Sequence, residues 1–507
     1  MVQTLRIISR ICQIVFALFL AYISFRLLRY HLDLITFPYS NTLREGAMMM
    51  STDALLKGLN PYNMATQPQF MNQYGIMYPL LVWPWAKFLG NTIFIHRLIT
   101  GFSILGSCTL IFLVLKKKNV PLLLNIWAFL MLYASLMYPG TSTPTIDPGA
   151  TGMFFFLLTI FIPWFCKFSY PSLIMSVLCA LLAFYTKLYT FLGAFIMLSY
   201  LFLFMSRVKG LFYGFLLLIV TVLSISIVNQ ILPAYFDNCF FAAVNMGPAW
   251  SNIGRLYEQI HIYNHIHFWL FILIAAYLIG FAVKYVTDFK KPLIQPHFPL
   301  VVYAAICSSL VLYFSLGRHT GAMLWYFFQL LSPFLLISCA WIFSRNQYWP
   351  MLCAPLLIYN LYTFTTDQDH KWFTDHNDGW PQVSSIIDQH DKILNSPVIA
   401  PLLVEKNKEV FDNGQAEYFG TGGQRTSFMK LFFKEDQRVN YQLDYFFYRI
   451  RNMVENKEFD LIILQPGLLP LGVGDDIKKF YTFQGQALLY APQDRRPYAV
   501  TFWSPNK

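Results

Sequence analysis

Charged residues are the scarcest class in this chain. Only 12% of its 507 residues are Asp, Glu, Lys or Arg, whereas 56% are apolar. Soluble domains carry about a quarter charged residues, so this balance excludes a soluble multidomain protein and indicates an integral membrane protein. The aromatic share of 18%, with 49 Phe and 31 Tyr, suits helices that contact lipid and the membrane interfaces.

Cysteine pairs and cofactor motifs are also missing. The 8 cysteines are scattered through apolar segments, none forms a CxxC pair, and none lies beyond residue 365. This pattern disfavours a disulfide framework and a zinc site. The chain contains no GxxxxGK[ST], no GxGxxG after a strand, no HExxH and no paired metal ligands. We therefore expect no cofactor, and a divalent metal has no support in the sequence.

The net charge of +11 does not come from one long basic patch that would fit nucleic acid. The basic residues form small groups between apolar runs, as the positive-inside bias produces at cytoplasmic loops. These groups are Arg6 with Arg10, Lys116 to Lys118, Arg207 with Lys209, and Lys290 with Lys291. Membrane orientation therefore explains much of the basicity.

Apolar runs long enough to cross a bilayer recur along the first 364 residues. The first run lacks a cleavage site and opens a series of similar runs, so we interpret it as a retained span and not as a signal peptide. The runs predict about eleven transmembrane helices, near 8–29, 95–115, 120–138, 148–166, 171–187, 190–206, 211–232, 266–286, 298–314, 323–343 and 348–364.

A cytoplasmic N-terminus and a cytoplasmic turn at Lys116 to Lys118 fix the sidedness of the other loops by alternation. The loops expected on the outer side are 30–94, 139–147, 187–190, 233–265 and 315–322, together with the C-terminal tail. Within the first loop, "REGAMMMSTDALLKG" and "YPLLVWPWAKFL" have the pattern of short helices that lie at the membrane interface.

The composition changes at about residue 365, since 19 of the 26 acidic residues lie beyond residue 350. We divide the chain into a transmembrane domain, 1–364, and a small α/β domain, 365–507, on the outer side. Short strands are expected in "SPVIAPLLVE" (396–405) and "FDLIILQP" (459–466), and a helix in 443–458. A late strand pair is expected in "QALLYAP" and "YAVTFWSP".

Six of the seven carboxylates in the first 350 residues fall on loops expected outside. Ionisable groups near span ends are costly and are candidates for function. Glu45 and Asp147 are the two that we select. The alternative is local: Glu45 can serve as a helix-start charge, and Asp147 before Pro148 is suited to cap the next helix.

Basic residues join these carboxylates on the same side. Lys187 interrupts a nearly continuous apolar stretch, and Arg318 and His319 lie on a short turn. Cations at headgroup depth suit a lipid phosphate. The alternatives are snorkelling for Lys187 and an exposed turn for the other two. Carboxylates beside cations suggest a general base that takes a proton from a hydroxyl, with cations that stabilise a departing phosphate.

The chain resembles the GT-C class of membrane glycosyltransferases that use polyprenyl-phosphate sugars. The residues that carry the resemblance are "LREGAMMMSTDALLKGLNPYN", "QYGIMYPLLVWP", "HRLI", "TIDPGATG", "YTKLYTF" and "LGRHTGAMLWYFFQLLSPFLL", in that order. It implies a catalytic base at Glu45, an acceptor-binding or donor-binding acid at Asp147, and donor-phosphate ligands at Lys187 and Arg318. His319 and Arg44 are further phosphate candidates, and Asp53, Tyr62, Tyr74 and Tyr78 are candidates to line the substrate cavity.

The resemblance implies a monomeric enzyme of a bacterial inner membrane. It would move a sugar from undecaprenyl phosphate to a cell-envelope glycan or lipid, such as the O-antigen of lipopolysaccharide. Two other classes stay open: a transporter or flippase for a lipid-linked sugar, and a non-catalytic assembly protein. Transporters often show repeats and midplane charges, and neither is visible here.

Overall fold

The computed structural model describes most of the chain. The described residues are 2–141, 143–241, 254, 256–263, 299–316, 324–345, 349–366, 368, 373, 379–416, 438–465 and 473–506. Two predicted phosphate ligands, Arg318 and His319, lie outside them, as does the expected helix at 266–286.

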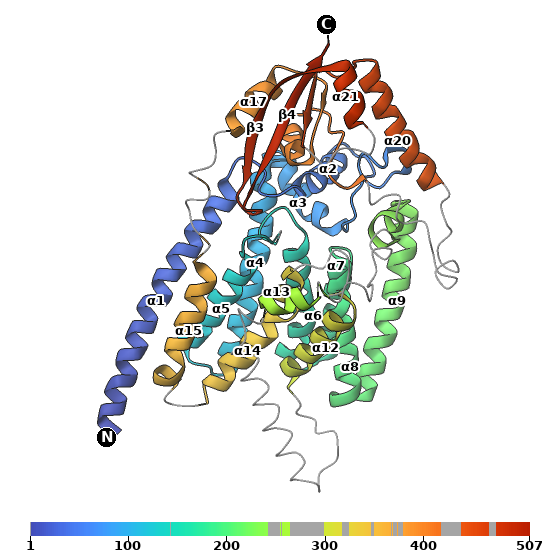
Figure 1. Cartoon of the computed structure of the whole chain (residues 1–507). Coiled ribbons are helices and arrows are strands. Elements are labelled where there is room, and N and C mark those ends of the chain that lie inside the picture. The colour runs from blue at the N-terminus through green and yellow to red at the C-terminus, as the bar shows by residue number, and fades with distance from the viewer. Residues whose placement is uncertain are drawn as a thin grey trace.

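Apolar helices make up the larger part of the molecule (Figure 1). Within the described residues, four stretches are long and apolar enough to cross a membrane: α1 (Val2–Thr36), α4 (Ile93–Lys117), Leu188–Met205 and α9 (Arg207–Ile231). A fifth is formed if α13 (Leu324–Leu330) and α14 (Ser332–Phe343), bent by 51°, count as one span. Shorter apolar helices are α5 (Leu122–Leu136), α6 (Gly149–Phe165), α7 (Tyr170–Phe184) and α12 (Leu300–Phe314). The protein is therefore a multi-pass membrane protein, while the count of eleven stays a prediction.

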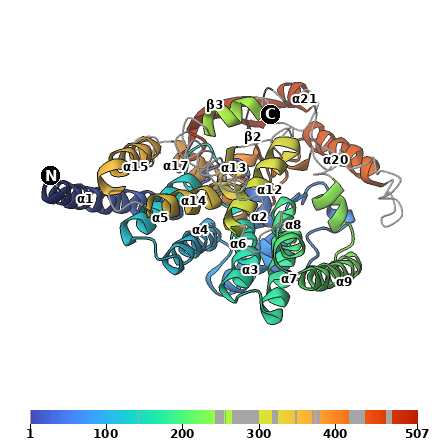
Figure 2. The ribbon, with the colours of Figure 1, turned by 90° about the horizontal axis from the view of Figure 1, so that it is seen from below.

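Outer helices of the bundle present apolar side chains to their surroundings. On α1, Leu18 is 68% exposed and Phe25 66%, and on α9 Phe215 is 68% exposed. Exposed apolar faces of this length are what lipid-facing helices carry. Figure 2, viewed along the bundle, shows α1 beside α15 (Trp349–Thr365) at one flank and α9 beside α7 and α8 (Leu192–Tyr200) at the other.

The first long loop forms the two expected helices, α2 (Glu45–Leu56) and α3 (Met77–Leu89). Both lie between the bundle and the C-terminal part of the chain (Figure 1). Gly46 on α2 packs so closely on the C-terminal part that an added Cβ would lie 2.6 Å from the Cβ of Ala400. Nine of the twelve residues of α2 are buried, so this helix is packed on most of its circumference.

A four-stranded sheet, ordered β1-β2-β4-β3, forms the C-terminal part. β1 (Ile393–Leu394) runs parallel to β2 (Leu461–Leu464), and β4 (Arg496–Pro505) runs antiparallel to both β2 and β3 (Tyr481–Ala491). Helices α17 (Gly379–Asp388), α20 (Arg438–Glu455) and α21 (Gly474–Phe480) flank the sheet (Figure 1). The expected strand in 459–466, the helix in 443–458 and the late strand pair are confirmed.

The strand expected in 396–405 is wrong. This segment forms a 3₁₀ turn, Pro397–Ile399, followed by the helix α18 (Ala400–Glu405). Pro397 and Pro401 explain the difference, because proline cannot donate to a strand ladder but is favoured in the first turn of a helix. The short β1 immediately before this segment was not expected.

The apolar core runs without interruption from the bundle into the C-terminal part. Tyr39, just after α1, stacks on Trp380 of α17 with ring centroids 4.9 Å apart and planes 4° apart. Phe373 packs edge-on against both Tyr30 and Phe37. The N-terminal end of α1 and the C-terminal sheet lie at opposite ends of the molecule (Figure 1). The sheet is therefore fixed to one end of the helices.

Candidate functional site

Two loops far apart in sequence pair through their backbones at the end of the bundle that faces the sheet. Gly75 N–H donates to Thr186 O at 3.2 Å, and Met77 N–H donates to Tyr185 O at 2.9 Å. Gly75 permits this approach because any Cβ there would lie 1.9 Å from Tyr185 O. The pairing places Tyr74 of the first loop beside the turn that carries Lys187.

Lys187 and Asp147 form a buried ion pair at this junction. The ammonium donates to both carboxylate oxygens of Asp147, at 2.9 Å and 3.2 Å. The side chains are only 8% and 2% exposed. Burial alone would lower the pKa of Lys187, but the Asp147 carboxylate and the nearby Tyr189 and Tyr74 outweigh it and raise the pKa above its ordinary value. Lys187 therefore carries its charge inside a buried junction, opposite the Asp147 carboxylate.

Aromatic rings enclose the ammonium of Lys187. Its nitrogen lies 5.0 Å from the ring centre of Tyr74, 5.5 Å from that of Tyr189 and 5.9 Å from that of Trp325 on α13. Cation–π attraction of this kind strengthens when water is excluded. The three rings therefore stabilise the ammonium of Lys187, which could bind a negatively charged ligand.

A short polar chain continues from the aromatic enclosure. The hydroxyl of Tyr189 donates to the side-chain oxygen of Gln329 on α13, whose amide nitrogen donates to Thr143 Oγ1 at 3.1 Å. Gln329 and Thr143 are buried. The loop before α6, the turn before α8 and helix α13 are thus joined by side-chain hydrogen bonds.

Asp147 also lies at the start of α6, but not at the N-cap position that the local alternative predicted. Its Oδ1 accepts a hydrogen bond from Gly149 N–H at 2.6 Å. Pro148 takes the N-cap position, so Asp147 lies one residue before it. The bond from Gly149 helps to fix the orientation of the Asp147 carboxylate, which stays paired with Lys187.

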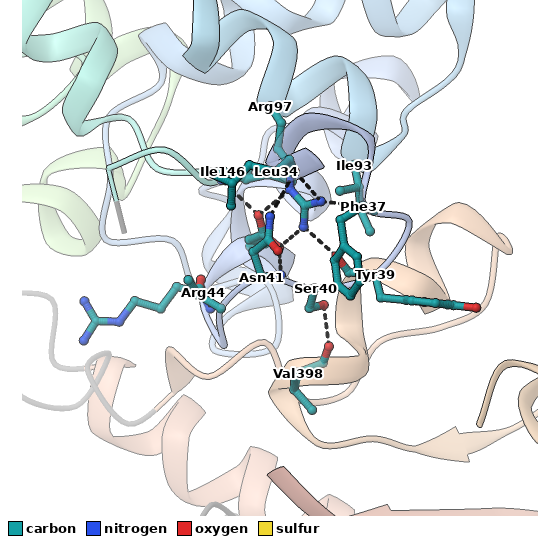
Figure 3. A network of polar contacts seen from close by, with 12 residues as sticks. Leu34, Phe37, Tyr39, Ser40, Asn41, Arg44, Ile93, Arg97, Ile146 and Val398 are labelled. Atoms are coloured by element: carbon teal, nitrogen blue, oxygen red, sulfur yellow. Dashed lines mark hydrogen bonds and ion pairs between the residues drawn. The ribbon is translucent and has the colours of Figure 1, made fainter. Parts of the chain in front are cut away.

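Glu45, the second predicted acid, lies in a different environment. Its carboxylate pairs with Arg97 of α4, with Nε to Oε1 at 2.9 Å and Nη2 to Oε2 at 2.7 Å, and both side chains are 0% exposed. Backbone N–H groups of Asn41 and Ile146 donate to the same carboxylate, at 2.8 Å and 3.1 Å. Figure 3 shows this network between α1, α2 and α4. Both oxygens of Glu45 are therefore engaged within the protein.

Arg97 is one of the site residues that sequence reasoning missed, together with Tyr189, Trp325 and Gln329. It lies in the "HRLI" segment, which contributed to the family resemblance without a role for the arginine. A single arginine at a span end has the same pattern as a snorkelling side chain. The only available signal was its place inside an apolar run, where an ionised group needs a partner.

Of two other predicted residues, Arg44 lies near the Lys187 enclosure and Asp53 does not. Arg44 is half-buried, points away from Arg97 (Figure 3) and interacts electrostatically with Tyr326 of α13, next to the Lys187 enclosure. Asp53 lies elsewhere, in an exposed pair with Lys57 at 2.6 Å.

Two of the predicted cavity tyrosines lie in packed interior positions. Tyr62 donates its hydroxyl proton to Tyr74 O at 2.9 Å, and Tyr78 donates to His96 O at 3.0 Å. Both are fully buried. Their hydroxyl groups bond to backbone carbonyls of the protein. Of Tyr62, Tyr74 and Tyr78, only Tyr74 has its ring beside the ammonium of Lys187. Within the described ranges, no three His, Cys, Asp or Glu side chains converge as metal ligands would.

Two solved structures of ArnT from Cupriavidus metallidurans have a similar fold. The one bound to undecaprenyl phosphate has a TM-score of 0.55 and 10% sequence identity, and the match covers 96% of this chain and 97% of ArnT. The structure in the apo state has a TM-score of 0.56, with the same identity and coverage. No protein-family model matches the chain, and no curated protein matches it in sequence. The GT-C membrane fold expected from the sequence motifs is confirmed at the level of fold.

Proposed function

We propose that this protein is a membrane glycosyltransferase that moves a sugar from a polyprenyl-phosphate donor, such as undecaprenyl phosphate, to a cell-envelope glycan or lipid. The O-antigen of lipopolysaccharide is the acceptor that we favour. The observation that carries the proposal is the buried Asp147–Lys187 pair, enclosed by aromatic rings, in a fold that 96% of the chain shares with a structure that holds undecaprenyl phosphate. The membrane is a bacterial inner membrane, with the N-terminus cytoplasmic and the domain from about residue 365 periplasmic.

Lys187 is the donor-phosphate ligand in this proposal. Its charge lies where the helices meet the first loop, so a lipid phosphate can reach it while the prenyl chain lies against the apolar helices. The phosphate competes with Asp147 for the ammonium. Phosphate binding therefore leaves the Asp147 carboxylate available to a hydroxyl. Arg44, Arg318 and His319 are the further proposed sources of positive charge.

Asp147 is the general base that the geometry favours. The acceptor hydroxyl gives its proton to the carboxylate, and its oxygen bonds to the anomeric carbon of the sugar. The bond from that carbon to the phosphate oxygen breaks, and the electron pair leaves with polyprenyl phosphate, whose charge Lys187 stabilises. Glu45 is the base that the family resemblance implies, but Arg97 binds both of its oxygens and two backbone N–H groups also donate to them.

A transfer assay tests the proposal and the choice of base together. The purified full-length protein receives a labelled polyprenyl-phosphate sugar and an envelope-glycan acceptor, and transfer or slow hydrolysis is expected. Asp147→Asn should lower the rate by about 10²-fold or more, in the range of lost general-base catalysis. Lys57→Gln, in the exposed pair with Asp53 of the first loop, should leave the rate unchanged. Movement of the donor across a vesicle membrane without transfer would instead identify a transporter.

A further inference from the structure

Arg97 joins three segments of the chain. Besides Glu45, its guanidinium donates to the backbone carbonyls of Leu34 at 3.2 Å, Phe37 at 2.5 Å and Tyr39 at 2.6 Å. These carbonyls lie at and just beyond the end of α1 (Figure 3). A buried guanidinium is costly unless its donors are satisfied, and here the end of α1 and the start of α2 both satisfy them.

Glu45 extends this connection to the loop that carries Asp147. The carboxylate oxygen that accepts from Arg97 Nε also accepts from Ile146 N–H, at 2.9 Å and 3.1 Å. Ile146 directly precedes Asp147, whose carboxylate holds Lys187. A continuous set of hydrogen bonds therefore runs from α1 through Arg97 and Glu45 to the backbone N–H of Ile146, the residue before Asp147.

We propose that Arg97 and Glu45 are positioning residues that fix the backbone at Ile146, so that the Asp147 carboxylate is held toward Lys187. The inference rests on the proposed function, in which Asp147 and Lys187 meet the substrates. In this proposal Arg97 and Glu45 do not contact substrate, because the guanidinium and the carboxylate already bond to one another and to backbone groups of the protein.

The geometry of the pair explains why this position carries an ion pair. A buried pair adds little net stability compared with apolar residues of the same volume. The planar fork of arginine, however, binds both oxygens of a carboxylate in one orientation, and a lysine offers only a point charge. The pair therefore fixes the orientation of the Glu45 carboxylate. Arg97→Lys should keep the positive charge but no longer hold the carboxylate in that orientation.

Amide exchange at the Asp147 loop tests the inference without any need for activity. In the full-length protein in detergent, exchange of the 144–149 segment should accelerate about tenfold or more in Arg97→Lys and in Glu45→Gln, because the Ile146 N–H loses its fixed acceptor. Lys57→Gln should exchange as the wild type does. Glu45→Asp, which withdraws the carboxylate by one methylene, replaces Glu45→Gln if that variant does not fold.

Kinetics of the same variants separate positioning from catalysis. The donor KM should stay within about threefold of the wild type while kcat falls by about 10²-fold, the cost of a misplaced catalytic group. The acidic limb of the pH profile of kcat should persist in Glu45→Gln, because the base is Asp147. Wild-type exchange at 144–149 in both Arg97→Lys and Glu45→Gln, or loss of the acidic limb in Glu45→Gln, would overturn the inference. Absence of transfer by the wild type would refute the proposed function instead, and the exchange experiment would still decide the role of the pair.

Discussion

Removing one member of the Asp147–Lys187 pair should destabilise the protein far more than removing both. Asp147→Asn leaves the volume nearly unchanged, but it leaves the ammonium of Lys187, only 8% exposed, without its counter-charge. Breaking a buried pair from one side costs about 3–5 kcal/mol. Lys187→Met, which leaves the carboxylate unpaired, should cost a similar amount.

The double variant Asp147→Asn with Lys187→Met should recover most of this loss. It contains no buried charge at the junction, and apolar or neutral replacements of buried pairs are often close to neutral, so we expect a cost of about 1 kcal/mol relative to the wild type. The two single costs are then strongly non-additive, as contacting residues are. Denaturant titration of the protein in detergent measures all three free energies.

The exposed pair Lys57–Asp53 supplies the matched control. Its side chains are 61% and 24% exposed, and each neutralisation there should cost less than about 1 kcal/mol. If Asp147→Asn cost no more than this control, or if the double variant were as unstable as the two single costs added together, the buried pair would not have the energetics described here.

Three further predictions concern the surroundings of the site. Gly75→Ala places a Cβ 1.9 Å from Tyr185 O, so the backbone pairing beside Lys187 should open and the transfer rate should fall at least about tenfold, measured in the labelled-donor assay. Gly46→Ala should destabilise the protein by about 1–3 kcal/mol by overpacking Ala400, and the second change Ala400→Gly should restore stability in the same denaturant titration. Burial raises the pKa of Glu405 above its ordinary value of 4.5, although the Ile93 N–H bond and Arg97 act in the opposite direction. The folded protein therefore binds this proton more tightly than the unfolded chain does, and the stability that it contributes is lost as pH rises through the folded-state pKa of Glu405. Glu405→Gln should flatten this part of the profile of Tm against pH.

Local sequence patterns were sufficient to predict the helices and strands whose periodicity and end residues are distinct. The helix starting at Glu45, the aromatic helix α3 and the late pair β3 and β4 each follow from periodicity and from their bounding residues. The segment 396–405 failed because its apolar run matched a strand, whereas its two prolines favoured a helical start. The two prolines in the sequence already indicated a helix, but the strand was predicted from the apolar run alone.

The site itself was only half predictable. Alternation of loops placed Asp147 and Lys187 on one side of the membrane, but nothing in the sequence joins residues 40 positions apart into one ion pair. Glu45 was predicted as an accessible acid because its loop was expected at the surface. Its burial arises from packing of α2 against α4 and the C-terminal part, which no local pattern encodes.

The most direct test of the central claim is transfer of a labelled sugar from polyprenyl phosphate by the purified full-length protein. We predict transfer to an envelope glycan or lipid in the wild type, about 10²-fold slower transfer in Asp147→Asn, and wild-type transfer in Lys57→Gln. A wild-type protein that binds the donor but neither transfers nor hydrolyses it, or an Asp147→Asn variant as active as the wild type, would contradict the account.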